Sequence, residues 1–296
     1  MTEAAMETIL AARQVGKAFD GRQVLTDITA NVAPGSVIGV LGKNGAGKTT
    51  LLEIVLGFSP ASSGSVQLWG HESVSLPSPI KGRIGYVPQQ DDLIPLLTGT
   101  QQLALTASLY RNWDHQLIAR LTKEWEVPLD RRISALSGGE RQKISMLLAL
   151  GHRPDLLVLD EPLASLDPIA RRSFLRQLLE ITADQTHAVL FSSHIVSDLE
   201  RVANEVWILR QGRMAWQGDL DALKESVVRL HLRARDPLPA RIGVAHTLRE
   251  EIDGHTATIS VSRWRAEDAD SLAARLHAEV EVEPLDLEDI FLEMHR

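Results

Sequence analysis

The run LGKNGAGKTTLLEIVLGF, residues 41–58, constrains the fold more than any other part of the chain. It begins at the end of the apolar run 36–41, which has the length and β-branched content of a buried parallel strand. The residues that follow, 49–58, carry apolar side chains at helical spacing, and Gly57 is placed to end that helix. The glycines between them therefore join a strand to a helix N-terminus in an α/β fold.

This glycine loop matches the pattern of a phosphate-binding loop, in which a glycine is followed after four residues by Gly-Lys-Ser/Thr. Glycines let successive backbone N–H groups point at an anion, and the helix dipole adds positive potential there. The lysine would reach the β and γ phosphates of ATP, and the threonine hydroxyl would bind Mg2+. A glycine-rich turn without a ligand is the alternative, and the flanking strand and helix favour a nucleotide-binding loop over such a turn. The residues expected to hold the nucleotide are Gly42, Asn44, Gly45, Ala46, Gly47, Lys48, Thr49 and Thr50.

A second apolar strand, in DLLVLDE (155–161), ends in two carboxylates. Ligands bind at the carboxyl ends of the strands in open parallel sheets, which is where Asp160 and Glu161 would lie. Asp160 suits the role of a magnesium ligand, and Glu161 is placed to orient the attacking water or accept its proton. A buried strand ending in a solvated acidic turn is the alternative, and the phosphate loop disfavours it.

Between these two strands lies LSGGE (136–140), followed by a helix with an apolar stripe. Ser137, Gly138 and Gly139 would therefore lie at a helix N-terminus, where a hydroxyl and unhindered amides form a second anion site. Because the chain has one phosphate loop, a second anion site suggests that another copy contributes the nucleotide. A serine N-cap with flexible glycines is the alternative.

Together, GKNGAGKTT, LSGGE, LLVLDEP and SLD occur in the order and approximate spacing of the nucleotide-binding subunits of ATP-binding cassette (ABC) transporters, which the first 220 or so residues resemble. The resemblance implies a head-to-tail dimer in which ATP lies between the phosphate loop of one subunit and the LSGGE of the other. It also implies a separate transmembrane permease as partner, Mg2+ as cofactor, and a second nucleotide-binding subunit that is identical or different.

Three further positions are carried over from this family. Gln89, in IGYVPQQ, matches the glutamine that approaches the metal and the water and links the ATP state to the membrane partner, although Gln90 leaves the register open. His194 matches the switch histidine expected to contact the γ phosphate. Phe19 falls where the family keeps an aromatic ring to stack on adenine, and a core phenylalanine is the alternative.

The segment after the catalytic glutamate departs from the family. The family often has P-T-S-G-L-D, whereas residues 162–167 read PLASLD, so Asp167 is retained and the small polar pair is lost. The resemblance still places Asp167 at the nucleotide, and the change is expected to alter contacts across the dimer.

The predicted architecture is a RecA-like P-loop ATPase core with an antiparallel β subdomain and a helical subdomain. The ATPase domain covers residues 1–220, with the helical subdomain at about 91–152, and residues 221–296 form a small C-terminal α+β domain. The antiparallel strands are expected in ILAARQV, VLTDITANV and SVQLWG. In the C-terminal domain, strands are expected around 228–232, 257–264 and VEVEP, with helices at 270–278 and LEDIFLEM. An arginine stripe there, Arg229, Arg233 and Arg235, is typical of a solvated strand face.

Composition narrows the function classes. With 39 acidic and 31 basic residues the formal charge is −8, so no nucleic-acid partner is expected. The absence of cysteine excludes disulfides and thiol chemistry, the N-terminus carries acids where a signal peptide carries bases, and no apolar run reaches the 18 to 20 or so residues that cross a bilayer. A cytoplasmic protein, peripheral on the inner face of the membrane, is expected.

The hypothesis is a Mg2+-dependent ATPase that energises a separate permease through ATP-driven dimer closure. Export is favoured over import because LDLEDIFLEM resembles the end of many drug and antibiotic exporter subunits of the ABC-2 type. The alternative is a soluble cassette ATPase acting as a regulatory or mechanical module. Such proteins resemble split cassettes interrupted by a coiled coil or tandem cassettes, whereas this chain has one uninterrupted cassette.

Overall fold

The computed structural model of the protein describes residues 8–295. The chain divides into two compact units, with the boundary between Gln217 and Gly218. Each unit has its own cluster of buried apolar side chains. Between residues 8 and 295, no helix combines the length and the apolar character needed to cross a membrane.

The first unit is built on a six-stranded sheet in the order β10-β9-β3-β8-β7-β6. Neighbouring strands from β9 to β6 run parallel. Every residue of β3, β7 and β8 is buried, as expected for strands covered on both faces. Because β3 and β7 both flank β8, their carboxyl ends share one edge of the sheet, and this edge carries the site. The strands are β3 (Val37–Leu41), β6 (Ile84–Val87), β7 (Leu156–Asp160), β8 (Ala188–Ser192), β9 (Glu205–Arg210) and β10 (Arg213–Asp219).

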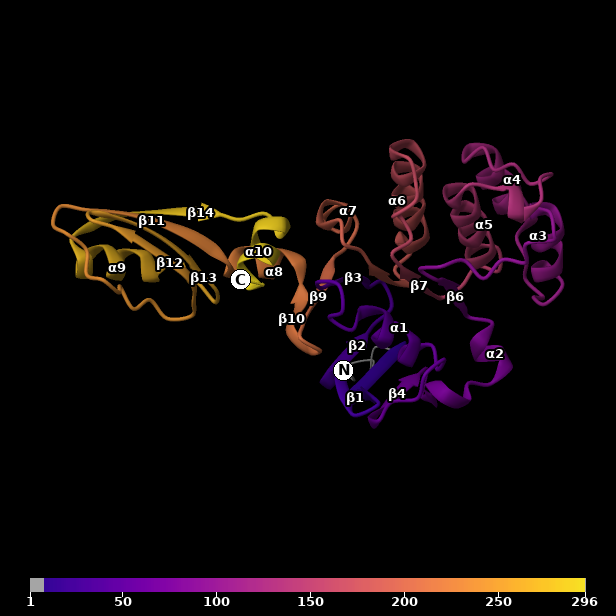
Figure 1. Ribbon diagram of the computed structural model, residues 1–296, viewed down its shortest axis with the longest axis horizontal. Coiled ribbons are helices and arrows are strands. Elements are labelled where there is room, and N and C mark those ends of the chain that lie inside the picture. The colour runs from indigo at the N-terminus through magenta and orange to yellow at the C-terminus, as the bar shows by residue number, and fades with distance from the viewer. Residues whose placement is uncertain (1–7, 296) are drawn as a thin grey trace, which may run out of the picture. The chain divides into compact units, whose positions relative to one another are not determined.

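An antiparallel sheet with the order β2-β1-β4-β5 lies beside α1 in the same unit (Figure 1). The first three of its strands are those expected from the sequence. One core cluster joins this sheet to α1 and to the central sheet, so the phosphate loop is held between two packed layers. The elements are β1 (Leu10–Phe19), β2 (Arg22–Val32), β4 (Ser63–Leu68), β5 (His71–Glu72) and α1 (Lys48–Val55).

Helices fill the chain between β6 and β7, as the sequence predicts. Three of them, α3, α4 and α5, pack together in Figure 1, with α5 in contact with the other two. The buried side chains of α4 are Leu117, Ile118 and Leu121, which share one face at helical spacing. The helices of this unit are α2 (Ser78–Lys81), α3 (Gly99–Ala107), α4 (His115–Glu124), α5 (Gly138–Leu150), α6 (Pro168–Thr182) and α7 (Val196–Glu200), with 3₁₀ turns at Ser73–Ser75 and Ile133–Ala135.

The second unit is an antiparallel sheet in the order β12-β13-β11-β14 with three helices, so the small α+β appendage is confirmed. The alternating side chains of β11 point Val228, Leu230 and Leu232 into its core. One strand, β12, was not anticipated, because TLREEID carries four charges and lies at the sheet edge. The elements are α8 (Leu220–Ser226), β11 (Val228–Ala234), β12 (Thr247–Asp253), β13 (Thr256–Val261), α9 (Asp268–Leu276), β14 (Ala278–Pro284) and α10 (Leu287–Met294).

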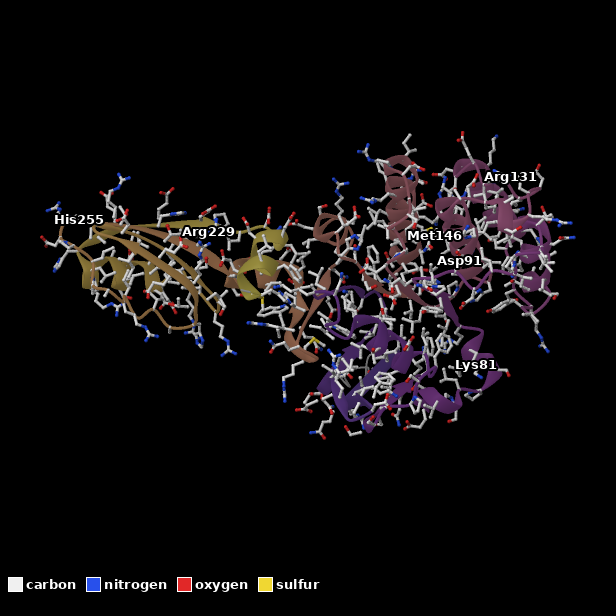
Figure 2. All side chains as sticks on the ribbon, in the orientation of Figure 1. Lys81, Asp91, Arg131, Met146, Arg229 and His255 are labelled. Atoms are coloured by element: carbon white, nitrogen blue, oxygen red, sulfur yellow. The ribbon has the colours of Figure 1, made fainter. Side chains whose placement is uncertain are left out.

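The expectation of a solvated arginine stripe on β11 is wrong for Arg229, which is labelled in Figure 2. Its side chain is only 21% exposed and lies within 4 Å of three carboxylates. Strand pairing places Glu283 directly opposite, at 3.3 Å, and α10 supplies Asp289 at 3.9 Å and Glu293 at 3.5 Å. Arg229 thus ties the sheet to α10. The sequence pattern of one strand does not reveal this because the partners lie more than fifty residues away.

Candidate nucleotide-binding site

A cavity of about 250 Å3 lies at the carboxyl edge of the central sheet. It brings together the phosphate loop, the residue after β7 and the segment after β6. Gln89 lines it and Gln90 does not, which favours Gln89 as the glutamine of the site. Val24 was not predicted, because nothing in the sequence separates it from other strand valines. The lining residues are Val24, Asn44, Gly45, Gly47, Lys48, Thr49, Thr50, Gln89 and Glu161.

The loop needs glycine at its two most crowded positions. Gly47 has φ 102°, and a Cβ there would lie 2.6 Å from Leu25 Cδ2. A Cβ on Gly42 would lie 2.9 Å from the carbonyl oxygen of Leu209. Gly47 is also the N-cap of α1, and no side chain among the described residues caps that helix. The N–H groups of its first turn are therefore left for a ligand.

Lys48 connects the loop to the end of β7. Its side chain is 7% exposed, and its Nζ donates to the carbonyl oxygen of Gly42 at 2.8 Å. The same Nζ lies 3.8 Å from Glu161 Oε1. A buried ammonium group is stable only beside acceptors or anions, so the cavity favours a negatively charged ligand that contacts Lys48.

Asp160, the last residue of β7, is fully buried. Its Oδ1 accepts a hydrogen bond from Ser192 Oγ at 2.6 Å, while its Oδ2 has no hydrogen-bond partner among the described residues. Buried carboxylate oxygens without a partner are rare, and a hard cation is the natural partner. Thr49 lines the cavity, and its hydroxyl together with the Asp160 carboxylate supplies the oxygen ligands that Mg2+ prefers.

Glu161 is held by its backbone and by two neighbours. Its φ of 50° is uncommon for a side chain of this size, and it places the carboxylate in the cavity instead of along the strand. Its N–H donates to Ser192 Oγ at 2.8 Å, and the N–H of His194 donates to its Oε2 at 3.3 Å. His194 Nδ1 also hydrogen bonds to that oxygen. Ser192 therefore positions both carboxylates. It was missed in the sequence, although a polar residue that ends an apolar strand is a usable signal.

The LSGGE residues do not line this cavity. Ser137 is the N-cap of α5: its Oγ accepts from the N–H of Glu140 at 3.2 Å, and its own N–H donates to Glu140 Oε2 at 2.7 Å. This backbone hydrogen bond holds the pKa of Glu140 below its usual value. A Cβ on Gly139 would lie 2.6 Å from the carbonyl oxygen of Ser165, whereas one on Gly138 would meet no atom closer than 3.9 Å.

Asp167 and Phe19 also lie outside the cavity lining. Asp167 caps α6 by accepting from the N–H groups of Ile169 and Ala170, both at 2.9 Å, and the bond from Ala170 holds the pKa of Asp167 below its usual value. Phe19 is 46% exposed, so the alternative of a core phenylalanine is wrong. Lys17 Nζ lies 4.7 Å from the centre of its ring.

Comparisons with known proteins agree on the family. A family model described as ABC transporter matches residues 25–164. ABC transporter ATP-binding protein YtrB of Bacillus subtilis is 31% identical over 224 residues, 76% of each chain. Nod factor export ATP-binding protein I of Burkholderia thailandensis is 31% identical over 295 residues, 95% of each chain.

Solved structures give the same result for the fold. The structure of an ATP binding subunit of an ABC transporter has a TM-score of 0.65 and 29% identity, and covers 72% of this chain and 91% of that chain. A dimeric ATP-binding cassette in a post-hydrolysis state, bound to ADP and Pi, has a TM-score of 0.64 and 22% identity, and covers 71% and 98%. With two relatives matched over most of their length and the phosphate loop opposite Glu161, the protein belongs to the ATP-binding subunits of the ABC transporter family.

Proposed function

We propose that the protein hydrolyses ATP in a Mg2+-dependent reaction and so drives export through a separate transmembrane permease. The observation that carries the proposal is the cavity in which the phosphate loop faces Glu161, itself fixed by Ser192 and His194. A carboxylate held opposite a phosphate cradle is placed to act on a water that attacks the γ phosphate.

The roles follow from the contacts. The open N-terminus of α1 and Lys48 would bind the β and γ phosphates, while Thr49, Asp160 and Gln89 would hold Mg2+. Mg2+, when bound, neutralises charge on the phosphate oxygens. The Glu161 carboxylate accepts a proton from water as the water oxygen bonds to the γ phosphorus and the bond to the ADP oxygen breaks.

His194 has two roles in the proposed mechanism. Its Nδ1 is engaged by Glu161, and its side chain is 55% exposed, which leaves the rest of the ring open toward solvent. We assign it to orienting the carboxylate and contacting the γ phosphate. In this arrangement, Lys48 and His194 contact the two oxygens of Glu161 separately, at Oε1 and Oε2.

A second cassette subunit, identical or different, would complete each ATP site. The Ser137 Oγ accepts the N–H of Glu140, so the hydroxyl hydrogen stays available to donate to a phosphate of the partner's nucleotide. Gly138 and Gly139 add N–H groups from the first turn of α5. The exposed ring of Phe19 is available to stack on adenine, and Asp167 at the start of α6 is available to contact the partner.

A groove of about 400 Å3 in the first unit supports a permease partner. It is lined mainly by apolar and aromatic side chains, and Lys81, labelled in Figure 2, adds a positive charge. Phe58 and Val74 are 65% and 58% exposed there. Neighbouring large apolar side chains with this much exposure are typical of a surface that binds a partner. In an ABC transporter, the partner expected to fill this groove is an amphipathic cytoplasmic segment of the permease.

Strand β6 connects this groove to the nucleotide. Ile84 and Tyr86, on β6, line the groove, and Gln89, which follows the strand, lines the ATP cavity. A change in the ATP site can therefore reach the permease through three residues of chain. This short connection supports the transporter over a soluble regulatory ATPase. A location on the cytoplasmic face of the membrane is part of the same proposal.

Export is proposed on two grounds. The relative from Burkholderia thailandensis is named for Nod factor export and matches along 95% of both chains, including the C-terminal unit. The closing helix α10 contains the LEDIFLEM segment that resembles the ends of exporter subunits. No nucleic-acid partner is proposed, because the net charge is −8.

The substitution Glu161→Gln tests the hydrolysis mechanism. It keeps the size and one acceptor oxygen but removes the proton acceptor, so ATP turnover should fall about 100-fold or more. ATP binding should persist, and the protein should accumulate as an ATP-bound dimer in size-exclusion chromatography. Glu126→Gln, at an exposed carboxylate on another part of the chain, is the matched control. Substantial turnover by Glu161→Gln would refute the assignment.

The transport role needs a separate measurement. The tagged protein, purified from detergent-solubilised native cells, should bring down a multi-span membrane protein in stoichiometric amount. Mass spectrometry identifies that protein and with it the chain that selects the cargo. Recovery with no membrane protein would remove the transport claim and leave the ATP chemistry intact.

A further inference from the structure

The second unit contains a cavity of about 670 Å3 that plays no part in the ATPase mechanism. Its walls are residues 243–246, residues 262–265 and one face of α9 that carries Asp268, Ser271, Leu272 and Arg275. Small-molecule sites in proteins have volumes of roughly 300 to 1,000 Å3. The cavity, called here the Trp264 pocket after the tryptophan between Arg263 and Arg265, is therefore large enough for a small-molecule ligand.

The charge of the Trp264 pocket is positive. Arg263, Arg265 and Arg275 line it against one carboxylate, Asp268. Arg265 has a weak, exposed ion pair with Glu267 at 3.7 Å. Along residues 8–295, no carboxylate lies within ion-pair distance of Arg263 or Arg275.

Arg229 in the same unit shows the contrast. It lies within 4 Å of Glu283, Asp289 and Glu293, which neutralise it as part of the fold. Guanidinium groups present a planar set of donors that match carboxylate and phosphate geometry. Arg263 and Arg275 come from different segments and converge on one cavity with these donors unused by the protein's own carboxylates.

An apolar wall lies beside the arginines. Trp264 packs against the core cluster of the unit while also lining the pocket, and Leu272, which is 5% exposed, and Val244 adjoin it. A partly buried tryptophan offers a flat surface for a planar ring. The combination is that of small-molecule sites, which are lined by apolar and aromatic groups with a few placed charges.

Hydrogen bonds hold the walls together. The N–H of Ser262 donates to the carbonyl oxygen of His246 at 3.0 Å, and Thr247 Oγ1 donates to the carbonyl oxygen of Val244 at 2.7 Å. The N–H of Trp264 donates to the carbonyl oxygen of Ser226 at 2.9 Å. The two loops are therefore tied to each other and to α8, so the pocket is part of the packed unit.

A simpler reading treats the arginines as solvated surface residues. Arg275 lies in the last turn of α9, where a cation stabilises the helix dipole in any case. This reading does not account for Arg263, which lies in a loop with φ 57° and places a second cation at the same cavity beside Trp264. We propose that the Trp264 pocket binds a small organic anion, with a planar ring against Trp264 and a phosphate or carboxylate group on Arg263 and Arg275.

The test is a titration of the full-length 15N-labelled chain followed through the indole N–H signals of its six tryptophans. The substitution Trp264→Phe identifies the signal of Trp264. The probes are phenyl phosphate and benzoate, which carry both ring and anion, with inorganic phosphate and phenol carrying one each. Because no tryptophan lines the phosphate-loop cavity, binding of phosphates there does not supply this signal.

We expect a saturable shift of the Trp264 signal with phenyl phosphate, benzoate or both. The probe with the lower Kd shows whether the pocket prefers a phosphate or a carboxylate group. Inorganic phosphate and phenol should bind at least about tenfold more weakly. The double variant Arg263→Gln/Arg275→Gln should raise the Kd at least about tenfold. Arg235→Gln, an exposed arginine outside the pocket, is the control and should leave it unchanged.

Two results would overturn the proposal. One is the absence of a saturable shift with both ring-bearing anions. The other is a Kd that the double variant leaves unchanged. If the double variant is misfolded, as its indole spectrum would reveal, the single variant Arg275→Gln on the surface of α9 decides, with a weaker Kd supporting the proposal and an unchanged one refuting it.

Discussion

Two helix N-termini in the first unit, those of α1 and α5, have glycine at or directly after the N-cap, and they are built differently. The N-cap of α1 is Gly47, and among residues 8–295 no side chain closes that end of the helix. The N-cap of α5 is Ser137, and a reciprocal capping box with Glu140 closes that end. The N-terminus of α1 leaves its backbone N–H groups open to a ligand. At the N-terminus of α5, the capping box already binds part of the N–H groups.

The difference shows which site depends on the fold of this chain alone. The first-turn N–H groups of α1 are left open beside Lys48, and Glu161 faces them within the same unit. The α5 end is stable without a ligand and retains only the Ser137 hydroxyl hydrogen and the N–H groups of Gly138 and Gly139 to offer. This is the behaviour expected of a surface that meets a nucleotide only when a second subunit arrives.

A third N-terminus provides a reference for the comparison. The N-cap of α3 is Thr98, which forms the same kind of capping box with Gln101, and no residue of α3 lines the ATP cavity. Substitutions at α1, α5 and α3 therefore separate the effect on ligand binding from the effect on helix stability.

The largest effect is expected for Gly47→Ala at α1. The new methyl group would lie 2.6 Å from Leu25 Cδ2 in a residue with φ 102°, so strain and overpacking together should cost about 3 kcal/mol. ATP affinity should fall at least about tenfold because the loop must move. Urea unfolding and calorimetric titration with ATP measure the two effects.

Gly45→Ala is the matched control for this substitution. Gly45 also has positive φ, 79°, but no atom lies within 4 Å of the added Cβ. Only the backbone cost remains, about 1 kcal/mol. Equal losses of stability in the two variants would contradict the claim that close packing against Leu25 fixes the loop.

The next effect is expected for Gly139→Ala at α5. Its methyl group would lie 2.6 Å from the carbonyl oxygen of Ser165, so the start of α5 or the Ser165 segment must shift at a cost of about 1 to 2 kcal/mol. Gly138→Ala meets nothing closer than 3.9 Å and should keep or slightly raise stability. Urea midpoints check both, and ATP turnover should fall in both variants. Full turnover by Gly138→Ala would show that α5 does not approach a nucleotide.

The chain's parallel core was predictable because its signals are local. The phosphate loop is specified by residues adjacent in sequence. Strands β3, β7 and β8 are five buried residues each, apolar except for the polar residues Asp160 and Ser192 that end β7 and β8. Strand β12 was not predictable, since TLREEID has no clear apolar alternation and gains its structure by pairing with β13. The charge pattern of β11 was also misleading for Arg229, whose partners come from β14 and α10.

The residues of the candidate site were likewise predictable where neighbouring residues in the sequence specify them. Its motif residues occur in adjacent positions, and Asp160 and Glu161 follow from the end of an apolar strand. Val24 could not be identified in this way, because it reaches the cavity from a distant strand. Ser192 also ends an apolar strand, but its contact with Asp160 depends on the pairing of β8 with β7. A serine N-cap at Ser137 was anticipated as an alternative to a binding site, and the structure contains this cap, as part of a capping box with Glu140.

A smaller effect is expected for Ser137→Ala and Thr98→Ala, which remove the same cap from α5 and α3. Each should lose about 1 kcal/mol of unfolding free energy, because a hydroxyl no longer accepts a first-turn N–H group. Only Ser137→Ala should also lower ATP turnover, by about tenfold, because it also loses a charge-assisted donor to the nucleotide. Equal turnover in the two variants would assign Ser137 to helix capping alone.

The smallest effect is a pH dependence that isolates the α5 cap. The hydrogen bond from the N–H of Ser137 lowers the pKa of Glu140 below its ordinary 4.5 in the folded chain. The stabilisation is therefore fully present above that value and is lost as pH falls through the lower, folded-state pKa. Glu140→Gln keeps an acceptor oxygen for Ser137 without titrating, so its urea midpoint should fall less steeply than that of the unsubstituted chain as pH falls below about 4.5. Glu126→Gln should follow the unsubstituted chain. If the midpoint of Glu140→Gln also follows it, the carboxylate of the capping box contributes nothing to stability, and α5 is closed by the serine hydroxyl alone.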